Sequence, residues 1–260
     1  MRISTFSVTL ICQTYLLNHP VISKQARPYL ARSAVSFGIV PAAKKTSGII
    51  AIDGPAAAGK GTLARRLARH LGYAYLDTGL LYRAVGMKTL EAGAQPSDHA
   101  AATKAAEELE AYEIDRPDLR GDIAANAASR VAAIPSVRRA LLAFQRRFAE
   151  APPGGAAGAV LDGRDIGTIV CPRAELKLFI TAAPEVRAAR RLKELRERGL
   201  EVIDTRVLRE MQERDARDYG RAASPLEPAS DAIVIDTSGL DPDAVLAAAL
   251  AAFATVKPPE

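Results

Sequence analysis

The chain has 260 residues, 48% of them hydrophobic, which is enough to bury the core of one α/β domain with elaborations. Its formal net charge of +5 is uneven: six of the 35 Lys and Arg residues and no acidic residue fall within residues 1–47, so the remainder carries 29 basic against 30 acidic residues. Tryptophan is absent and aromatic residues make up only 5%. A broad basic surface or an aromatic platform for nucleic acid is therefore not expected in the body of the chain.

The cysteine and histidine content predicts neither a disulfide framework nor a metal centre. Cys12 and Cys171 are far apart, and the three histidines are isolated in the sequence. This usage suits a reducing setting, and we expect a cytoplasmic monomer that binds neither nucleic acid nor membrane.

Residues 1–47 are rich in Ser and Thr and contain a weakly apolar run from Ile3 to Leu17. The composition fits an organelle transit peptide better than a secretory signal, and the run is too polar and too short to span a bilayer. We favour a third interpretation, a disordered extension or residues that precede the true start codon. The folded domain is then expected to occupy residues 48–260.

The first predicted strand is the apolar run Gly48–Ile52, which is typical of a strand buried on both faces. Residues 54–60 follow it and fit the pattern G-x-x-x-x-G-K. Leucines spaced by four residues then predict a helix from about Gly61, and Gly72 supplies its stop. Strand, glycine loop, lysine and helix occur in the order of a phosphate-binding loop, so we expect a nucleoside triphosphate site in which Lys60 reaches the β- and γ-phosphates.

One residue departs from the general phosphate-loop pattern. Gly61 stands where Ser or Thr usually follows the lysine, and Thr62 comes one position later. The hydroxyl of Thr62 can therefore contact either Mg²⁺ or a phosphate, and the sequence leaves both open.

The remaining elements alternate between strands and helices. Strands are predicted at residues 73–76, 159–161, 175–181 and 232–236. Helices are predicted at about 80–92, 97–112, 123–134, 136–150, 184–199, 204–219 and 241–256, with a polar connector at 113–122. This order predicts a five-stranded parallel sheet covered by helices on both faces, with ligands bound at the carboxyl ends of the strands.

Two polar groups follow predicted strands directly. The first is Asp77–Arg83, in which Arg83 lies near a helix start and can bind a second phosphate. For such a residue alone, a plain surface arginine is the commoner explanation. The second is Asp162-Gly163-Arg164-Asp165, which is poorly suited to packing. There Asp162 can hold Mg²⁺ directly or through water, Arg164 can contact phosphate, and Asp165 can accept a hydrogen bond from a base amino group.

The two charged helices near the C-terminus form a third group. Arg214, Asp218 and Arg221 fall at i, i+4 and i+7 on one face. A solvated, salt-bridged pair of helices is the usual explanation of such charge runs. The phosphate loop favours a role in neutralising phosphoryl charge for these residues and for Arg187, Arg190 and Arg191.

With these motifs in place, the chain resembles the bacterial cytidylate kinases from about Gly48 to its C-terminus. The resemblance rests on GPAAAGKGT (54–62), LDTGLLYRA (76–84), NAASRVAAIPSVR (126–138), LDGRDIGT (161–168), QERDARD (212–218) and DTSGL (236–240). It implies a P-loop kinase fold with a small helical monophosphate-binding region, about residues 80–150, and a helical lid, about residues 184–221. The family's β-rich insert looks trimmed here.

The resemblance also implies roles for individual residues. ATP would be held by Gly54, Pro55, Ala56, Ala57, Ala58, Gly59, Lys60, Gly61 and Thr62, with Mg²⁺ as cofactor and Asp162 and Thr62 as its candidate ligands. Cytosine would be recognised by Ser129, Arg138 and Asp165. The CMP phosphate would be held by Arg83, Arg164 and Arg221 beside Thr78, and the ribose by Arg214 and Asp218. The catalytic residues would be Lys60, Arg164, Arg190, Arg214 and Arg221.

The implied reaction is transfer of the γ-phosphoryl group of ATP to CMP or dCMP, in pyrimidine nucleotide metabolism. Cytosine carries an amino group where uracil carries a carbonyl, so a carboxylate at Asp165 would favour cytosine. Two alternatives stay open: the same chemistry on UMP or AMP, and a P-loop nucleotide switch or nucleic-acid-dependent ATPase.

Overall fold

The structure, a computed structural model, describes residues 46–197, 199, 204–222 and 224–256. The extension predicted for residues 1–47 therefore lies outside the described residues except at its end. Thr46 and Ser47 already belong to the first strand, which begins two residues earlier than the sequence predicts.

Five parallel strands form one sheet in the order β2-β3-β1-β4-β5. Their bounds are β1 Thr46–Asp53, β2 Ala74–Asp77, β3 Ala159–Gly163, β4 Ala174–Thr181 and β5 Ile233–Asp236. The predicted α/β fold with a five-stranded parallel sheet is confirmed. In register, Asp53 of β1 is opposite Gly163 and Asp77 of β2 is opposite Asp162, so the polar residues at the strand ends share one edge of the sheet.

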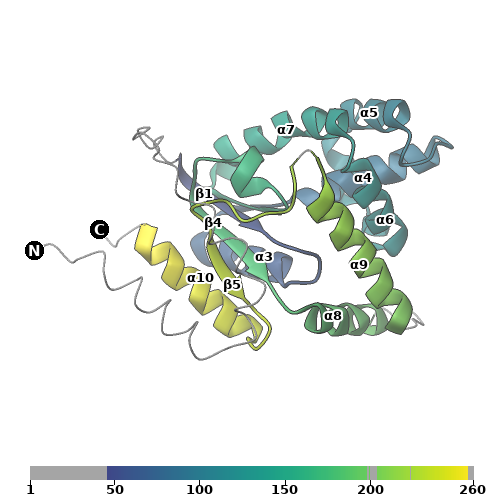
Figure 1. The fold of residues 1–260 in the computed structure, drawn as a ribbon. Coiled ribbons are helices and arrows are strands. Elements are labelled where there is room, and N and C mark those ends of the chain that lie inside the picture. The colour runs from purple at the N-terminus through teal and green to yellow at the C-terminus, as the bar shows by residue number, and fades with distance from the viewer. Residues whose placement is uncertain (1–45, 198, 200–203, 223, 257–260) are drawn as a thin grey trace, which may run out of the picture. The chain divides into compact units, whose positions relative to one another are not determined.

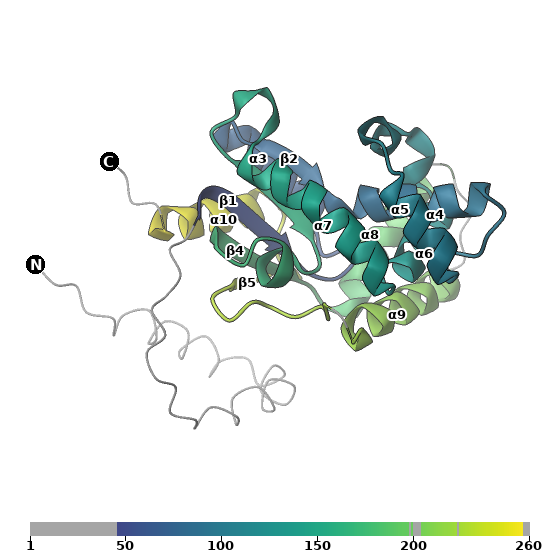
Figure 2. The ribbon, with the colours of Figure 1, turned by 90° about the horizontal axis from the view of Figure 1, so that it is seen from above.

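Helices cover both faces of this sheet (Figures 1 and 2). On one face α3 (Lys60–Leu71) and α10 (Pro242–Val256) pack on alternate strand residues such as Ile50 and Ile52. On the other face α7 (Pro135–Glu150) packs on the intervening residues Ile49 and Ala51, together with a π-helical turn, η4 (Ile166–Val170). This alternation is what a strand buried on both faces requires.

A second hydrophobic core lies beyond the strand ends. It is formed by α4 (Thr78–Glu91), α5 (His99–Glu107), α6 (Asp122–Val131) and the first half of α7. The helix predicted over 97–112 is shorter than expected, because its chain leaves the α conformation at Glu108 and continues as two 3₁₀ turns, η1 (Ala111–Asp115) and η2 (Pro117–Arg120), in place of the polar connector. Residues 78–150 contain no strand, as expected from the trimmed insert.

The last region consists of α8 (Pro184–Glu197) and α9 (Asp204–Gly220), which pack through a small apolar cluster around Ala188 and Met211. Ala57 of the glycine loop packs against the same cluster, so these helices form one wall beside that loop. Within the described part of the chain, no helix is both long and apolar enough to cross a membrane.

Candidate active site

A cleft of about 490 Å³ opens at the carboxyl ends of the strands. Its walls come from the glycine loop, the ends of β2 and β3, α6 and the helices α8 and α9. The predicted site residues that line it are Ala56, Ala57, Gly59, Lys60, Gly61, Thr62, Thr78, Arg83, Ser129, Arg138, Asp162, Arg164, Asp165, Arg214, Asp218 and Arg221.

Three carbonyl groups of the glycine loop are bound by donors of the protein. Lys60 Nζ donates to the carbonyl of Pro55 (2.9 Å), Arg187 to that of Ala56 (3.3 Å), and Thr237 Oγ1 to that of Ala58 (3.0 Å). Left-handed conformations at Ala57 (φ 57°) and Gly59 (φ 95°) turn the chain between them. Because these carbonyls are already occupied, the neighbouring N–H groups are the polar groups the loop can offer to a ligand.

The loop also depends on close approach of the main chain. A Cβ atom at Gly54 would lie 1.9 Å from the carbonyl oxygen of Ile180, in a conformation with φ 144°. No side chain fits there, so the glycine lets β1 run against β4 directly before the loop opens.

Lys60 is the buried cation of this loop. Lys60 is only 6% exposed. Its burial, together with the nearby Arg164, lowers the pKa of Lys60 to about 7. Among the described residues, the ammonium donates one hydrogen bond, to the carbonyl of Pro55. An anionic ligand in the cleft would therefore supply the negative charge that balances Lys60.

Asp162 at the end of β3 faces the same loop. Tyr75 donates its hydroxyl to Asp162 Oδ2 (2.8 Å), and burial, with the nearby Asp77, raises the pKa of Asp162 to about 6. A Cβ atom at Gly61 would lie 3.4 Å from the same oxygen, so glycine after the lysine leaves room for this carboxylate. Asp162 and Thr62 both line the cleft and offer the oxygen ligands that Mg²⁺ prefers, so the donor set fits that ion.

No group of three or more His, Cys, Asp or Glu side chains suited to a metal is found in the part of the chain that the structure describes. Mg²⁺ in phosphoryl-transfer enzymes is commonly held by one or two carboxylates together with substrate phosphates, which agrees with this sparse donor set.

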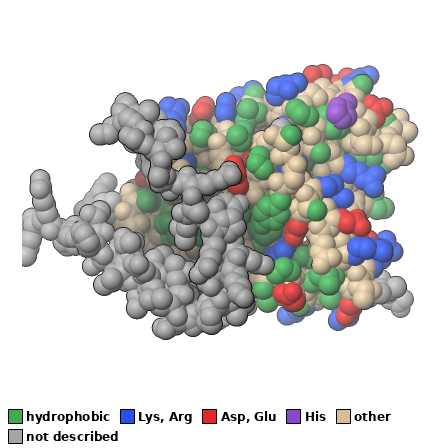
Figure 3. Space-filling view, viewed as in Figure 1, with side chains coloured by type: hydrophobic (Ala, Val, Ile, Leu, Met, Phe, Trp, Pro, Cys, Tyr) green, Lys and Arg blue, Asp and Glu red, His purple; other side chains and the backbone are tan. Residues whose placement is uncertain are grey.

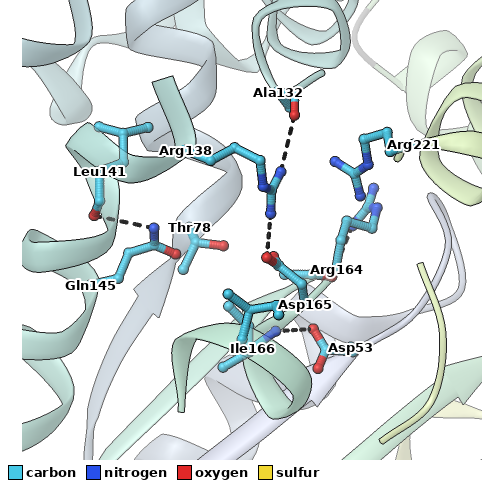
Figure 4. A network of polar contacts seen from close by, with 12 residues as sticks. Asp53, Thr78, Ala132, Arg138, Leu141, Gln145, Arg164, Asp165, Ile166 and Arg221 are labelled. Atoms are coloured by element: carbon cyan, nitrogen blue, oxygen red, sulfur yellow. Dashed lines mark hydrogen bonds and ion pairs between the residues drawn. The ribbon is translucent and has the colours of Figure 1, made fainter. Parts of the chain in front are cut away.

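Opposite the loop, Arg138 and Asp165 form a buried ion pair (Figure 4). Arg138 also donates to the carbonyl of Ala132 (3.1 Å) and lies over the ring of Tyr82, 5.4 Å from its centroid. Ser129 lies on the same side of the cleft, and its hydroxyl accepts a hydrogen bond from Arg217 Nε (3.0 Å). Both carboxylate and guanidinium are thus fixed before any ligand binds.

A second cluster joins β3 to α9. Arg164 Nε donates to Asp218 (2.9 Å), and Arg221 lies 3.9 Å from the same carboxylate. Burial alone would raise the pKa of Asp218, but Arg164, Arg214 and Arg221 hold it below its usual value. Burial and Arg164 lower the pKa of Arg214 to about 10, which shows how crowded the cations are.

Several guanidinium nitrogens of this cluster have no hydrogen-bond partner among the described residues. They are Nε of Arg214, and Nε and one terminal nitrogen of Arg221. Buried donors without partners are rare in folded proteins and commonly mark the position of a ligand. The arginines that carry these nitrogens line the cleft with Lys60, and this cluster of cations suits anionic ligands.

The other predicted contacts are more peripheral. Arg83 donates to the carbonyl of Leu119 (2.7 Å), and Thr78 Oγ1 donates to the carbonyl of Asp162 (2.8 Å), while both residues line the cleft. Gly54, Pro55 and Ala58 do not line it.

Arg190 is not among the residues that line the cleft, although a Cβ atom at Gly59 of the glycine loop would lie 3.9 Å from Arg190 Nη1. Its guanidinium donates to the hydroxyl (2.8 Å) and the carbonyl (2.6 Å) of Thr237, the residue that holds the loop carbonyl of Ala58. Arg191 lines the cleft instead, paired with Asp122 of α6 and with Glu194. One residue along a helix turns a side chain by about 100°, so neighbouring arginines face different ways.

Four residues that bind loops or side chains of the site without lining the cleft were given no role from the sequence: Asp53, Tyr75, Arg217 and Thr237. The aspartate at the end of an apolar strand and the threonine after the last strand are placed where ligands bind in such sheets. Tyr75 gave no signal of its own, whereas Arg217 lies within the quoted motif QERDARD without an assigned role.

The fold and this cleft define a P-loop kinase: a glycine loop between β1 and α3, and a cation-rich cleft at the strand ends. The sequence matches the cytidylate kinase family over residues 50–255. It is 65% identical over 204 residues to the cytidylate kinase of Paramagnetospirillum magneticum, covering 78% of this chain and 96% of that protein. The cytidylate kinases of Rhodospirillum rubrum (60% identical; 78% and 95% covered) and Methylocella silvestris (56%; 78% and 92%) are similarly close. The chain belongs to the cytidylate kinase family.

Proposed function

We propose that the protein transfers the γ-phosphoryl group of ATP to CMP and dCMP, forming ADP with CDP or dCDP, as a step of pyrimidine nucleotide metabolism. The observation that carries the proposal is the gathering of Arg164, Arg214 and Arg221 with Lys60 in one cleft, where nitrogens of Arg214 and Arg221 have no hydrogen-bond partner among the described residues. Family membership supplies the identity of the two nucleotides.

On the donor side, the loop amides and Lys60 bind the ATP phosphates. Positive charge at the start of α3 adds to the attraction of the loop for anions. The attraction between Lys60 and the transferring group is strongest in the transition state, when charge spreads over the oxygens of that group. The ammonium is already desolvated, so this attraction is not weakened by water.

On the acceptor side, Asp165 accepts the amino group of cytosine, with Arg138 and Ser129 completing recognition of the base. Arg164, Arg221 and Arg83 bind the CMP phosphate, beside Thr78, while Arg214 and Asp218 contact the sugar. Asp165 and Arg138 are buried, so a base that fails to pair with them leaves polar groups unsatisfied, which favours strong selectivity.

Asp162 and Thr62 would hold Mg²⁺, directly or through water. The ion, when bound with ATP, neutralises charge on the β- and γ-phosphates. Tyr75 fixes the orientation of Asp162 through its hydroxyl.

No strong general base is needed, because the acceptor is already a phosphate oxygen and the transition state is loose. The remaining task is to exclude water, for which we propose the wall formed by α8 and α9. Arg191 reaches the cleft from this wall, whereas Arg190, from its place on Thr237, acts on the donor loop and touches the reacting groups only if that contact breaks.

The expected setting is a cytoplasmic monomer that acts on free nucleotides. Basic and acidic side chains are interspersed on the described face that Figure 3 shows, with no broad basic area there for a polyanion.

A panel of monophosphates with coupled detection of ADP tests the proposal. We expect CMP and dCMP to be used in preference to UMP and AMP. If UMP or AMP outruns them, the base assignment is wrong. ATP hydrolysis stimulated by RNA and indifferent to CMP would instead favour a nucleic-acid-dependent ATPase.

A further inference from the structure

A buried carboxylate with no part in the proposed reaction lies under the loop that carries Arg164 and Asp165. Asp53, the last residue of β1, is only 5% exposed. Its Oδ1 accepts a hydrogen bond from the N–H of Ile166 (2.8 Å), and its Oδ2 accepts one from the N–H of Gly167 (2.7 Å). Figure 4 shows Asp53 beside Ile166 and below Asp165, whose carboxylate is joined to Arg138 above it.

The two amides that Asp53 binds are the first of the π-helical turn η4. Amides at the start of a helix have no partner within it. At the other end of the turn, Ile169 and Val170 donate to the carbonyl of Asp165 (2.9 and 3.1 Å), so Asp165 is itself part of the turn. Asp53 thus caps, from another strand, the turn that begins with the proposed base-reading carboxylate.

The space around the turn is closed on both sides. A Cβ atom at Gly167 would lie 3.1 Å from Lys177 Cδ and 3.3 Å from Asp53 Oδ2. At Gly163 a Cβ atom would lie 2.7 Å from Thr78 Oγ1. The turn therefore has little freedom to shift while the Asp53 hydrogen bonds hold it.

We propose that Asp53 is a positioning residue for the acceptor nucleotide, holding Arg164 and Asp165 in place through the backbone of η4. The inference rests on the proposed function. Asp53 touches neither nucleotide; it connects β1, which runs into the phosphate loop at Gly54, to the loop that binds CMP.

The position of Asp53 next to Gly54 suggests the opposite assignment, support of the ATP loop. The contacts favour the acceptor side, because both carboxylate oxygens bind amides of η4, while Lys60 donates to Pro55. The two assignments differ in which KM responds to substitution.

Asp53→Asn is the test, since an asparagine keeps one acceptor but points an NH₂ group at the second amide. We expect the KM for CMP to rise about tenfold or more, the KM for ATP to change less than about twofold, and the preference for CMP over UMP to fall. The matched control is Asp241→Asn. Asp241 also accepts two backbone amides, those of Asp243 and Ala244, but it is exposed at the start of α10, so neither KM should change.

An unchanged KM for CMP in Asp53→Asn, or a rise in the KM for ATP as large as that for CMP, would overturn the proposal. If Asp53→Asn does not fold, Gly167→Ala replaces it, because its methyl group crowds Oδ2 while Asp53 stays in place, and the same split between the two KM values is expected.

Amide exchange in the wild-type protein tests the contact without relying on activity. The Ile166 and Gly167 amides should exchange slowly; exchange at unprotected rates would disprove the Asp53 contact. Lack of CMP kinase activity in the wild type would refute the proposed function, whatever the exchange result.

Discussion

The donor and acceptor sides of the cleft are built from different chemical groups. On the donor side the loop presents main-chain amides, and side chains such as Thr237 and Arg187 hold its carbonyls from behind. On the acceptor side the reading groups are side chains, and they pair with each other, as Arg138 does with Asp165 and Arg164 with Asp218.

This difference determines what each side tolerates. A main-chain cradle is insensitive to side chains that point away from it but sensitive to any residue that changes its path, such as Gly54. A cluster of paired side chains is sensitive at every member, because removal of one partner leaves the other buried and uncompensated.

The largest effect is expected from Lys60, the one side chain on the donor side that we assign to the reacting phosphate. Lys60→Ala should reduce kcat about a thousandfold or more, because charge that develops in the transition state loses a desolvated cation. Single-turnover kinetics measure the fall in the rate of phosphoryl transfer, and a separate binding experiment measures the affinity for CMP. CMP binding should be nearly unchanged; a comparable loss of CMP affinity would mean that the two sides are not separate.

Asp165→Ala should show the opposite pattern, with a large effect on CMP and a small effect on ATP. Arg138 is only 9% exposed, and removing this carboxylate leaves its guanidinium buried without a partner. We therefore expect kcat/KM for CMP to fall about a hundredfold. ATP binding, measured by calorimetry, should stay within about twofold of wild type. Wild-type CMP kinetics in this variant would remove Asp165 from the site.

Thr237→Val probes the support behind the donor loop. The substitution removes the hydroxyl that donates to Ala58 and accepts from Arg190, so the KM for ATP should rise about three- to tenfold while that for CMP stays unchanged. Thr89→Val is the control: Thr89 is also fully buried and bonds one carbonyl, that of Val85, within α4. An equal rise in both variants would indicate a general loss of packing.

Deletion of residues 1–45 should have little effect on either side. The deletion leaves β1 whole, and the family match begins at residue 50. We expect kcat and both KM values to stay within about twofold, by the same coupled assay. A folded but inactive truncation would show that the extension contributes to the site.

The smallest effect concerns Cys171, which lies outside the cleft. Burial raises the pKa of the Cys171 thiol to about 12, so the reactive thiolate is scarce at neutral pH. Alkylation followed by mass spectrometry of the peptide that contains Cys171 should show slow modification at pH 7 to 9 and little change in activity. Rapid labelling would indicate that the face of the sheet under α7 opens easily.

The sequence predicts the parts of this molecule that are local. Short apolar runs placed all five strands, and the spacing of Leu63, Leu67 and Leu71 placed α3. Motif order also indicated which residues gather at the strand ends, since parallel strands bring their carboxyl ends to one edge.

Contacts between distant segments could not be predicted in the same way. Asp53 and Ile166 are 113 residues apart, and Tyr75 and Asp162 are 87 apart, so no local pattern connects them. The contact of Arg190 with Thr237 depends on how α8 packs, which a run of arginines does not reveal. The end of α5 was missed because the 3₁₀ turns that follow it carry helix-forming residues.

The paired state of Arg164 and Asp218 has a consequence for competing solutes. A simple oxyanion such as sulfate can bind the guanidinium nitrogens that Asp218 does not engage, but this carboxylate is itself buried, with a side chain 5% exposed. The oxyanion offers no donor to that carboxylate, whereas a sugar hydroxyl does. An intact nucleotide can thus satisfy both members of the pair at once, whereas a small anion competes with it only at the arginines.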